Sequence, residues 1–226
     1  MVGLLLVGLG GLLALVLVVL VRVSLVLRAG SRLQQQRRRR RSTDTGSVSV
    51  SVLVVAGSGG HTSEMLRLMD SLSPSYSPRH YVIADTDRMS EDKICSSERS
   101  RRQENSEDQF FIHRIPRSRE VLQSWSSSIF STLRALRFSI PLVFRLRPDV
   151  VLCNGPGTCV PLCVAALLLG ILGMKKVVLV YVESICRVQN LSLTGKILYP
   201  ITDYFFVQWA CLRDKYPRSI FLGRIV

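Results

Sequence analysis

The chain has 226 residues, of which 30 are Lys or Arg and 16 are Asp or Glu, so its formal net charge at pH 7 is +14. Eight of the arginines lie between positions 22 and 41, which concentrates the positive charge near the N-terminus. No aromatic or recognition element accompanies these arginines, so the charge does not indicate nucleic-acid binding. The six cysteines include no CxxC pair and only three histidines are present, so a metal site is not expected either.

Residues 1–27 predict a single transmembrane helix. The first 21 residues contain no charged or strongly polar side chain, and at ~1.5 Å per residue they span roughly 30 Å, the apolar thickness of a bilayer. A cleaved signal peptide is the alternative, but the apolar run is too long and arginine stands where a cleavage motif would lie. The basic linker over 28–47 predicts a lumenal N-terminus and a cytosolic body, and its arginines would also contact anionic lipid.

All six cysteines lie in the predicted cytosolic body, which is a reducing environment. Disulfides are therefore not expected, and the cysteines are interpreted as small, buried apolar residues. They are Cys95, Cys153, Cys159, Cys163, Cys186 and Cys211.

Residues 48–226 predict one domain in which Val-rich runs alternate with helical patterns. Strands are expected at 48–56, 79–85, 110–115, 149–153, 176–182 and 203–208. Helices are expected at 62–72, at 121–146 with a break near Pro141, and at 159–172, and a polar, exposed helix or loop at 88–102. The apolar helix 159–172 is too short to cross a membrane and is expected in the core. This alternation predicts an α/β fold with a Rossmann-like parallel sheet, covered on both faces.

Parallel sheets bind ligands at the carboxyl ends of their strands, so the loops after the strands are the candidate sites. The first loop, Gly57-Ser58-Gly59-Gly60-His61-Thr62, opens a helix, and its backbone N–H groups would bind a diphosphate or nucleotide. It matches neither the dinucleotide-binding nor the P-loop pattern, and a merely tight turn is the alternative. Glu64 would form a capping box at the start of that helix.

Two further loops follow predicted strands. Asn154-Gly155-Pro156-Gly157-Thr158 opens a second helix, either as part of a phosphate site or as a plain turn capped by Thr158. Glu183 follows the next strand, where its carboxylate would bind a sugar hydroxyl, act as a base, or pair with Arg187. Three polar loops at one edge of one sheet favour a binding site there.

The predicted helix 121–146 follows Arg117 and Arg119. Its apolar residues with basic neighbours favour docking at a membrane interface, and an ordinary core helix is the alternative.

Six motifs, taken as a set, resemble the membrane-anchor subunit of the bipartite UDP-N-acetylglucosamine transferase of the dolichol pathway, in its animal form. The resemblance extends over residues 48–226. The motifs are VLVVAGSGGHTSEMLRL (Val52–Leu68), RHYVIADTD (Arg79–Asp87), HRIPRSREV (His113–Val121), VLCNGPGTCVP (Val151–Pro161), VYVESICRV (Val180–Val188) and YPRSIFLGRIV (Tyr216–Val226).

The resemblance implies that the chain is the acceptor-side half of a GT-B glycosyltransferase at the endoplasmic reticulum membrane. A soluble catalytic subunit would bind UDP-GlcNAc, and the pair would add the second GlcNAc to GlcNAc-diphosphate-dolichol. The chain would need no cofactor and would not be an enzyme on its own. The apolar C-terminal tail would help to hold the partner, although a last core strand explains that tail equally well.

The resemblance also implies which residues form the site. The expected diphosphate-binding residues are Gly57, Ser58, Gly59, Gly60, Thr62, Asn154 and Gly155. His61 and Glu183 are the two hypotheses for the catalytic base. The alternative functions are a self-sufficient membrane-bound glycosyltransferase that uses a nucleotide sugar, an NAD-type enzyme, and a membrane adaptor without a working pocket.

Overall fold

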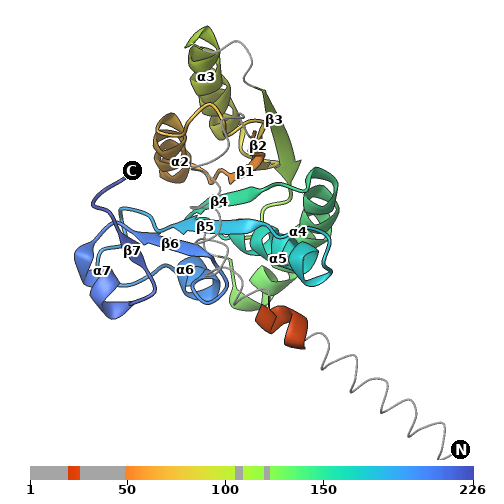
Figure 1. The fold of residues 1–226 in the computed structure, drawn as a ribbon, viewed down its shortest axis with the longest axis vertical. Helices are drawn as coiled ribbons and strands as arrows, with labels where there is room; N and C mark the ends of the chain where they lie inside the picture. The colour runs from red at the N-terminus through yellow and green to blue at the C-terminus, as the bar shows by residue number, and fades with distance from the viewer. Residues whose placement is uncertain (1–19, 26–48, 105–108, 120–122) are drawn as a thin grey trace, which may run out of the picture.

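The computed structural model describes residues 20–25, 49–104, 109–119 and 123–226, which form a seven-stranded sheet with helices on both faces (Figure 1). The linker predicted over 28–47, and all but residues 20–25 of the anchor predicted over 1–27, lie outside these residues. Residues 20–25 are helical. No helix within the described ranges is long and apolar enough to span a bilayer.

All seven strands run parallel, in the order β3-β2-β1-β4-β5-β6-β7. The order reverses direction between β1 and β4, and parallel sheets bind ligands beyond the carboxyl ends of the two strands at such a reversal. The strands are β1 (Val52–Val55), β2 (Arg79–Ala84), β3 (Phe110–Ile115), β4 (Val150–Asn154), β5 (Val178–Val182), β6 (Tyr204–Val207) and β7 (Ile220–Phe221). The predicted parallel α/β sheet is confirmed, and the predicted strands from 79–85 onward agree to within two residues at each end.

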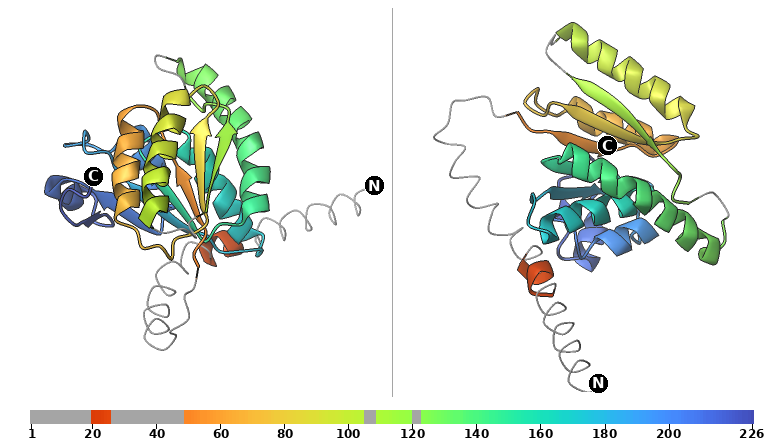
Figure 2. Two further views of the ribbon diagram at one scale, coloured as in Figure 1. Left: turned by 90° about the horizontal axis from the view of Figure 1, so that it is seen from above. Right: turned by 90° about the vertical axis from the view of Figure 1, so that its right-hand side faces the viewer.

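The helices cover the sheet in two layers, which Figure 2 shows from the side. They are α2 (Gly60–Asp70), α3 (Arg88–Glu104), α4 (Trp125–Leu146), α5 (Cys159–Ile171), α6 (Leu193–Leu198) and α7 (Ala210–Lys215). Successive strand residues point to opposite faces. In β1, Leu53 and Val55 pack in a core with α4 and α5, whereas Val52 and Val54 pack in a second core with α2 and α3.

The break expected near Pro141 is wrong, because α4 continues through it to Leu146. Proline has no N–H to donate to the carbonyl four residues earlier, which is that of Arg137. Both Pro141 and Arg137 lie on the exposed side of α4, where water can solvate that carbonyl. The helix begins at Trp125 with Ser124 as its N-cap, and the Ser124 side chain accepts from the Ser127 backbone N–H.

The segment 88–102 is a helix, α3, but it is not fully exposed as expected. Ile94 and Glu98 are buried. Glu98 accepts two hydrogen bonds from the Arg79 guanidinium, at 2.9 and 2.8 Å, and a third from the Tyr81 hydroxyl at 2.6 Å. A buried ion pair with this many hydrogen bonds attaches the polar helix α3 to β2.

The cysteine prediction holds for only part of the set. Cys153, Cys159 and Cys163 are buried beside one another in the core between β4 and α5, and burial raises the pKa of the Cys153 and Cys159 thiols. Cys186 and Cys211 are exposed, because they lie in the loop after β5 and on the outer side of α7. All six cysteines are free.

Candidate functional site

The glycine-rich loop lies at the carboxyl end of β1, beside the loop that follows β4. A Cβ atom on Gly57 would lie 2.8 Å from Cγ of Pro156, so the two loops touch at this point. Gly59 has φ of +66°, a backbone conformation that glycine adopts without strain. A Cβ on Gly59 or Gly60 would meet no atom within 4 Å, and Ser58 is exposed. The outer side of this loop is therefore open to a ligand.

The first turn of α2 offers backbone donors to that open side. Gly59 is the N-cap, no side chain caps it, and no acidic residue lies in the first turn. The N-terminus of a helix carries partial positive charge and attracts anions. α5 begins nearby, but the N–H groups of Cys159 and Val160 already donate to the carbonyls of Pro156 and Gly157. An anion at this edge would therefore bind mainly at α2.

A chain of hydrogen bonds joins the loops after β1, β4 and β5. His61 Nδ1 lies 3.0 Å from Asn154 Oδ1, and Asn154 Nδ2 donates to Glu64 at 2.9 Å. The second carboxyl oxygen of Glu64 accepts from the Ser184 hydroxyl at 2.8 Å. Asn154, Glu64 and Ser184 are buried, whereas His61 is only half-buried. The buried residues thus form a rigid support for one imidazole ring.

This series of hydrogen bonds determines which tautomer His61 adopts. The Asn154 amide directs its NH2 group to the Glu64 carboxylate, so its oxygen faces the imidazole. Nδ1 of His61 must then donate, and in the neutral ring Nε2 keeps its lone pair. Nε2 is the nitrogen that can accept a proton from a substrate.

Gly155 makes room for the His61 ring. A Cβ on Gly155 would lie 2.3 Å from Cε1 and 2.5 Å from Nδ1 of His61. Gly155 also has φ of +69°, which disfavours any other residue. Glycine is favoured here for two independent reasons, the space that the imidazole occupies and the positive φ.

Glu183 is turned into the protein. Its carboxylate accepts from the backbone N–H of Ser192 at 2.9 Å, from the Ser192 hydroxyl at 3.0 Å and from the backbone N–H of Ser184 at 3.2 Å. Burial raises the pKa of the Glu183 carboxyl, and the hydrogen bonds from Ser192 and Ser184 oppose this shift. Glu183 therefore joins β5 to the N-cap of α6, and its side chain does not reach the open side of the glycine loop.

Thr62 is also turned inward. Its hydroxyl donates to the Gly57 carbonyl and lies 2.6 Å from the Ser90 hydroxyl, which donates to Asp87 at 2.7 Å. Asp87 and Ser90 support the loop as well, although they were not predicted from the sequence. Asp87 also accepts a hydrogen bond from the Ser90 backbone N–H, as an N-cap residue does. The Asp-x-x-Ser pattern at the start of a helix is the sequence feature that could have predicted this contact.

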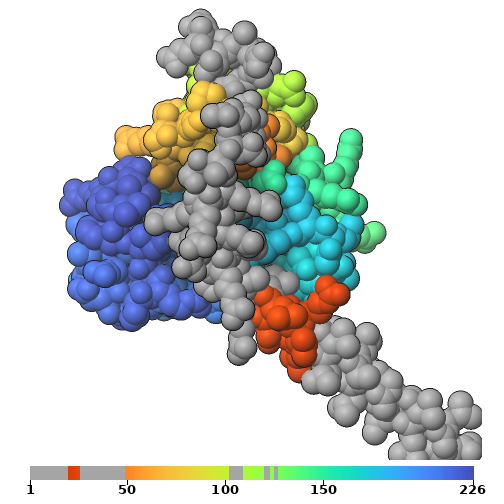
Figure 3. Space-filling model, viewed as in Figure 1, coloured from red at the N-terminus to blue at the C-terminus, as the bar shows by residue number. Residues whose placement is uncertain are grey.

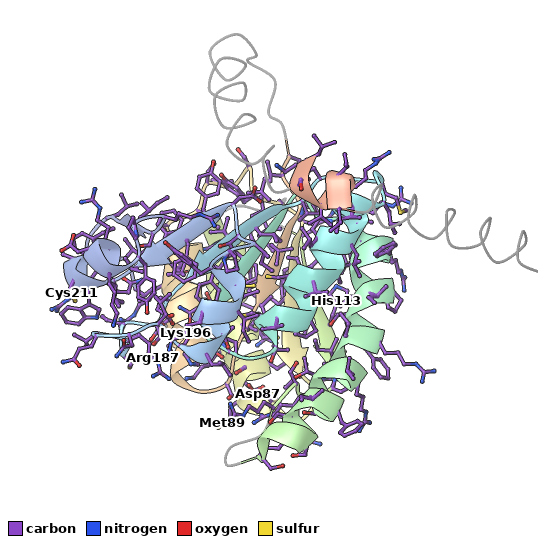
Figure 4. The ribbon with its side chains drawn as sticks, turned by 90° about the horizontal axis from the view of Figure 1, so that it is seen from below. Asp87, Met89, His113, Arg187, Lys196 and Cys211 are labelled. Atoms are coloured by element: carbon purple, nitrogen blue, oxygen red, sulfur yellow. The ribbon has the colours of Figure 1, made fainter. Side chains whose placement is uncertain are left out.

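The capping box expected for Glu64 is wrong, because its carboxylate bonds to Asn154 and Ser184 instead. Basic side chains lie around the same edge: Arg119 is exposed beside Gly157, and Arg187 is exposed after β5. Figure 4 shows Asp87, Met89 and Arg187 along this edge, with His113 deeper, beneath α4. Among the described residues, no group of three or more His, Cys, Asp or Glu could hold a metal ion.

The structure thus brings Gly57, Gly59, Gly60, His61, Asn154 and Gly155 together at one edge. The family model described as "Oligosaccharide biosynthesis protein Alg14 like" matches residues 52–225, a range that includes all of these site residues. The chain belongs to the Alg14 family.

Relatives within the Alg14 family are close. The UDP-N-acetylglucosamine transferase subunit ALG14 of Rattus norvegicus is 66% identical over 175 residues, which cover 76% of this chain and 81% of the relative. The subunit of the same name in Homo sapiens is 65% identical, again over 76% of this chain and 81% of the relative. The subunit of Schizosaccharomyces pombe is 46% identical, over 74% of this chain and 79% of the relative. The resemblance to an animal member of this family is confirmed.

Among solved structures, the crystal structure of MurG from Acinetobacter baumannii has a TM-score of 0.48 and 17% sequence identity to this Alg14-family chain. That match covers 70% of this chain and 41% of the MurG chain. The roles predicted for the nine site residues, His61 and Glu183 among them, stay predictions.

Proposed function

We propose that this chain is the acceptor-side, membrane-recruiting subunit of a UDP-N-acetylglucosamine transferase. In this proposal the enzyme adds the second GlcNAc to GlcNAc-diphosphate-dolichol in N-glycan precursor synthesis. Membership of the Alg14 family and close relatives named as transferase subunits support it. A subunit implies a partner, and a soluble catalytic subunit would bind UDP-GlcNAc and supply the second half of a GT-B enzyme. The chain would then be inactive alone.

One observation above all supports a role of this chain in the reaction. The Asn154 side chain holds the His61 ring by a hydrogen bond, next to the open N-terminus of α2. The acceptor's diphosphate would bind the backbone N–H groups of Gly59, Gly60 and His61. The acceptor hydroxyl oxygen would form a bond to the anomeric carbon of GlcNAc as the bond from that carbon to UDP breaks. The hydroxyl proton would pass to Nε2 of His61 and the electron pair would leave with UDP.

The proposal also places the chain in the endoplasmic reticulum membrane, with a lumenal N-terminus and the α/β domain in the cytosol. The apolar run over 1–21 and the eight arginines between 22 and 41 support this arrangement. A substrate with a dolichol tail cannot leave the bilayer, so an enzyme that uses it must be held at the membrane surface.

Co-expression of the full chain with the soluble catalytic subunit of the same pathway tests the proposal. The chain should bring the soluble subunit to membranes, and the complex should transfer GlcNAc from UDP-GlcNAc to the lipid acceptor. His61→Ala should recruit the partner normally but lower turnover by roughly 100-fold, the usual contribution of a general base. Arg67→Ala is the matched control, because Arg67 is exposed on the same helix.

Two outcomes would contradict the proposal. Turnover by the purified chain without a partner would support a self-sufficient glycosyltransferase instead. Normal turnover by His61→Ala in the complex would leave the chain as a membrane adaptor.

A further inference from the structure

The loop after β5 is held by two side chains that follow β6 in the sequence. Trp209 donates from Nε1 to the Ile185 carbonyl at 2.8 Å, and Gln208 donates from Nε2 to the Glu183 carbonyl at 3.3 Å. The Glu183 carbonyl belongs to the peptide group directly before Ser184, and Ile185 is the residue directly after it. Ser184 is thus held in place from both sides along the chain, which fixes the direction of its side chain.

Both donors are themselves fixed. Gln208 is buried, and its Oε1 accepts from the backbone N–H of Ile225 at 2.9 Å, so its Nε2 must face the Glu183 carbonyl. The Arg224 guanidinium lies 4.3 Å from the centroid of the Trp209 ring, which is a cation–π distance. Two consecutive residues, 224 and 225, therefore hold the two side chains that hold the loop.

The same C-terminal segment packs on the core beneath α2, the helix that carries His61 and Glu64. Ile225 and Val226 are partly buried against the apolar cluster to which α2 contributes. Figure 3 shows the C-terminal part of the chain (blue) beside α2 (gold). The segment thus supports the candidate site from two directions, through the loop after β5 and through α2.

Ser184 connects this arrangement to the imidazole. Its hydroxyl donates to one carboxyl oxygen of Glu64 at 2.8 Å, and Asn154 donates to the other at 2.9 Å. Asn154 in turn orients His61. A displaced Ser184 would leave one oxygen of the buried Glu64 carboxylate without this donor, so the carboxylate could turn. The Asn154 amide would then lose the acceptor that fixes it, and His61 would lose its fixed partner at Nδ1.

We propose that Gln208 and Trp209 are positioning residues for the transfer reaction, which keep His61 in its reactive tautomer without touching a substrate. The inference rests on the proposed function, in which Nε2 of His61 accepts the proton of the acceptor hydroxyl. Loss of either donor slows this proton transfer. Binding of the acceptor's diphosphate is unaffected, because the backbone N–H groups of the glycine-rich loop are not part of this series of hydrogen bonds.

Steady-state kinetics of the full chain with a saturating amount of its soluble partner test the proposal. Gln208→Met keeps the length of the side chain but cannot donate to a carbonyl, and Trp209→Phe keeps an aromatic ring but removes the indole N–H. Each should lower kcat by roughly 10-fold and leave the KM for the lipid acceptor unchanged. Val207→Ala is the matched control, because Val207 is buried in the apolar core at the end of the same strand. It should keep a normal kcat at temperatures at which it is folded.

A His61→Ala background separates positioning from a general loss of structure. A residue that acts through His61 has no further effect once the imidazole is absent, so Gln208→Met should lower kcat in the wild-type chain and not in His61→Ala. Nitrogen NMR of His61 in Gln208→Met should show both neutral tautomers instead of Nδ1–H alone. An unchanged kcat in the wild-type chain, or the same fold reduction in both backgrounds, would overturn the inference.

Failure of the proposed function gives a different result. If His61→Ala alone keeps normal turnover, the imidazole is not the base, and the inference falls together with the proposed role of His61. If His61→Ala is impaired while Gln208→Met and Trp209→Phe are not, the proposed function stands and only the inference fails.

Discussion

His61 Nδ1 lies 3.0 Å from Asn154 Oδ1, although the two residues are 93 positions apart in the chain. The contact joins the start of α2 to the end of β4 across the point where the strand order reverses. The amide of Asn154 is itself oriented by Glu64, so the imidazole is held in one tautomer by groups that do not face a substrate.

Glu64→Gln should weaken catalysis without removing any group from the open side of the loop. A glutamine amide can accept from or donate to Asn154, so the Asn154 amide is free to turn its NH2 group toward His61. His61 would then accept at Nδ1 and carry its proton on Nε2, which is the wrong tautomer for a base. Turnover of the complex should fall by roughly 10- to 100-fold.

Nitrogen NMR of the imidazoles checks the tautomer directly, since the chain has only three histidines to assign. Glu91→Gln is the control, because Glu91 pairs with Arg114 on the surface of α3. A Glu64→Gln variant that keeps the Nδ1–H tautomer and normal turnover would show that the hydrogen bonds of Asn154 and Glu64 do not determine the tautomer of His61.

Gly155→Ala should destabilise the protein and displace His61. The methyl group would meet the imidazole at 2.3 Å, and the positive φ adds strain of about 1–2 kcal/mol. Gly157→Ala in the same loop is the matched control, since its methyl group would approach only Arg119, at 3.8 Å. The unfolding temperature and the turnover should both decrease for Gly155→Ala and not for Gly157→Ala. Equal effects of the two substitutions would be inconsistent with this geometry.

Gly60→Ala separates ligand binding from folding. A methyl group at Gly60 meets no atom within 4 Å, and alanine in a helix is more stable than glycine by up to ~1 kcal/mol. The unfolding temperature should therefore stay the same or rise. If the acceptor's diphosphate approaches the backbone here, the KM for the lipid acceptor should rise while that for UDP-GlcNAc does not. An unchanged acceptor KM would place the diphosphate elsewhere.

Glu183→Gln distinguishes a structural role from a catalytic one. Both carboxyl oxygens accept from N–H or O–H groups, and an amide NH2 would leave at least one buried donor unpaired, at a cost of about 1–3 kcal/mol. We expect a lower unfolding temperature, with turnover largely retained at temperatures where the variant is folded. A loss of turnover by orders of magnitude at full stability would instead identify Glu183 as the base.

The sheet could be predicted from the sequence because its signals are local. Runs such as FFIHRI over Phe110–Ile115 carry their own strand pattern, apolar stripes mark α2 and α4, and a continuous apolar run marks α5. α6 and α7 were missed because each has six residues, too few for a helical period to stand out. Pro141 gave a false break because its cost depends on whether the carbonyl at Arg137 faces water.

The site was only partly predictable, for a different reason. The glycines and His61 stand out as a motif, but the direction of a side chain depends on what lies opposite it in space. Glu64 bonds to residues 90 and 120 positions away, and no pattern within the helix indicates that. Conversely, Thr62 and Glu183 follow strands as expected, yet their side chains bond to neighbours inside the fold.

A pair of histidines beneath α4, of which His80 is buried and His113 half-buried, predicts how stability depends on pH. His80 Nδ1 lies 3.1 Å from His113 Nε2, where His80 stacks on Phe111. Burial lowers the pKa of both imidazoles, helped by the neighbouring His113 for His80 and by Arg145 of α4 for His113. Above the unfolded pKa of about 6.5 both states are neutral and the pair has no effect on the pH dependence of stability. As the pH falls below that value, the unfolded chain binds protons first, so the free energy of unfolding decreases until the folded pKa is reached.

His80→Gln should therefore make the unfolding temperature less sensitive to pH between about pH 7.5 and pH 5.5. The His80→Gln variant and wild type are compared by thermal unfolding of the full chain, with Arg67→Ala, at an exposed position on α2, as the control. The slope of unfolding temperature against pH should decrease for His80→Gln and stay unchanged for the control. An unchanged slope for His80→Gln would mean that His80 binds protons equally in the folded and the unfolded chain, as it would if water reached it from beneath α4.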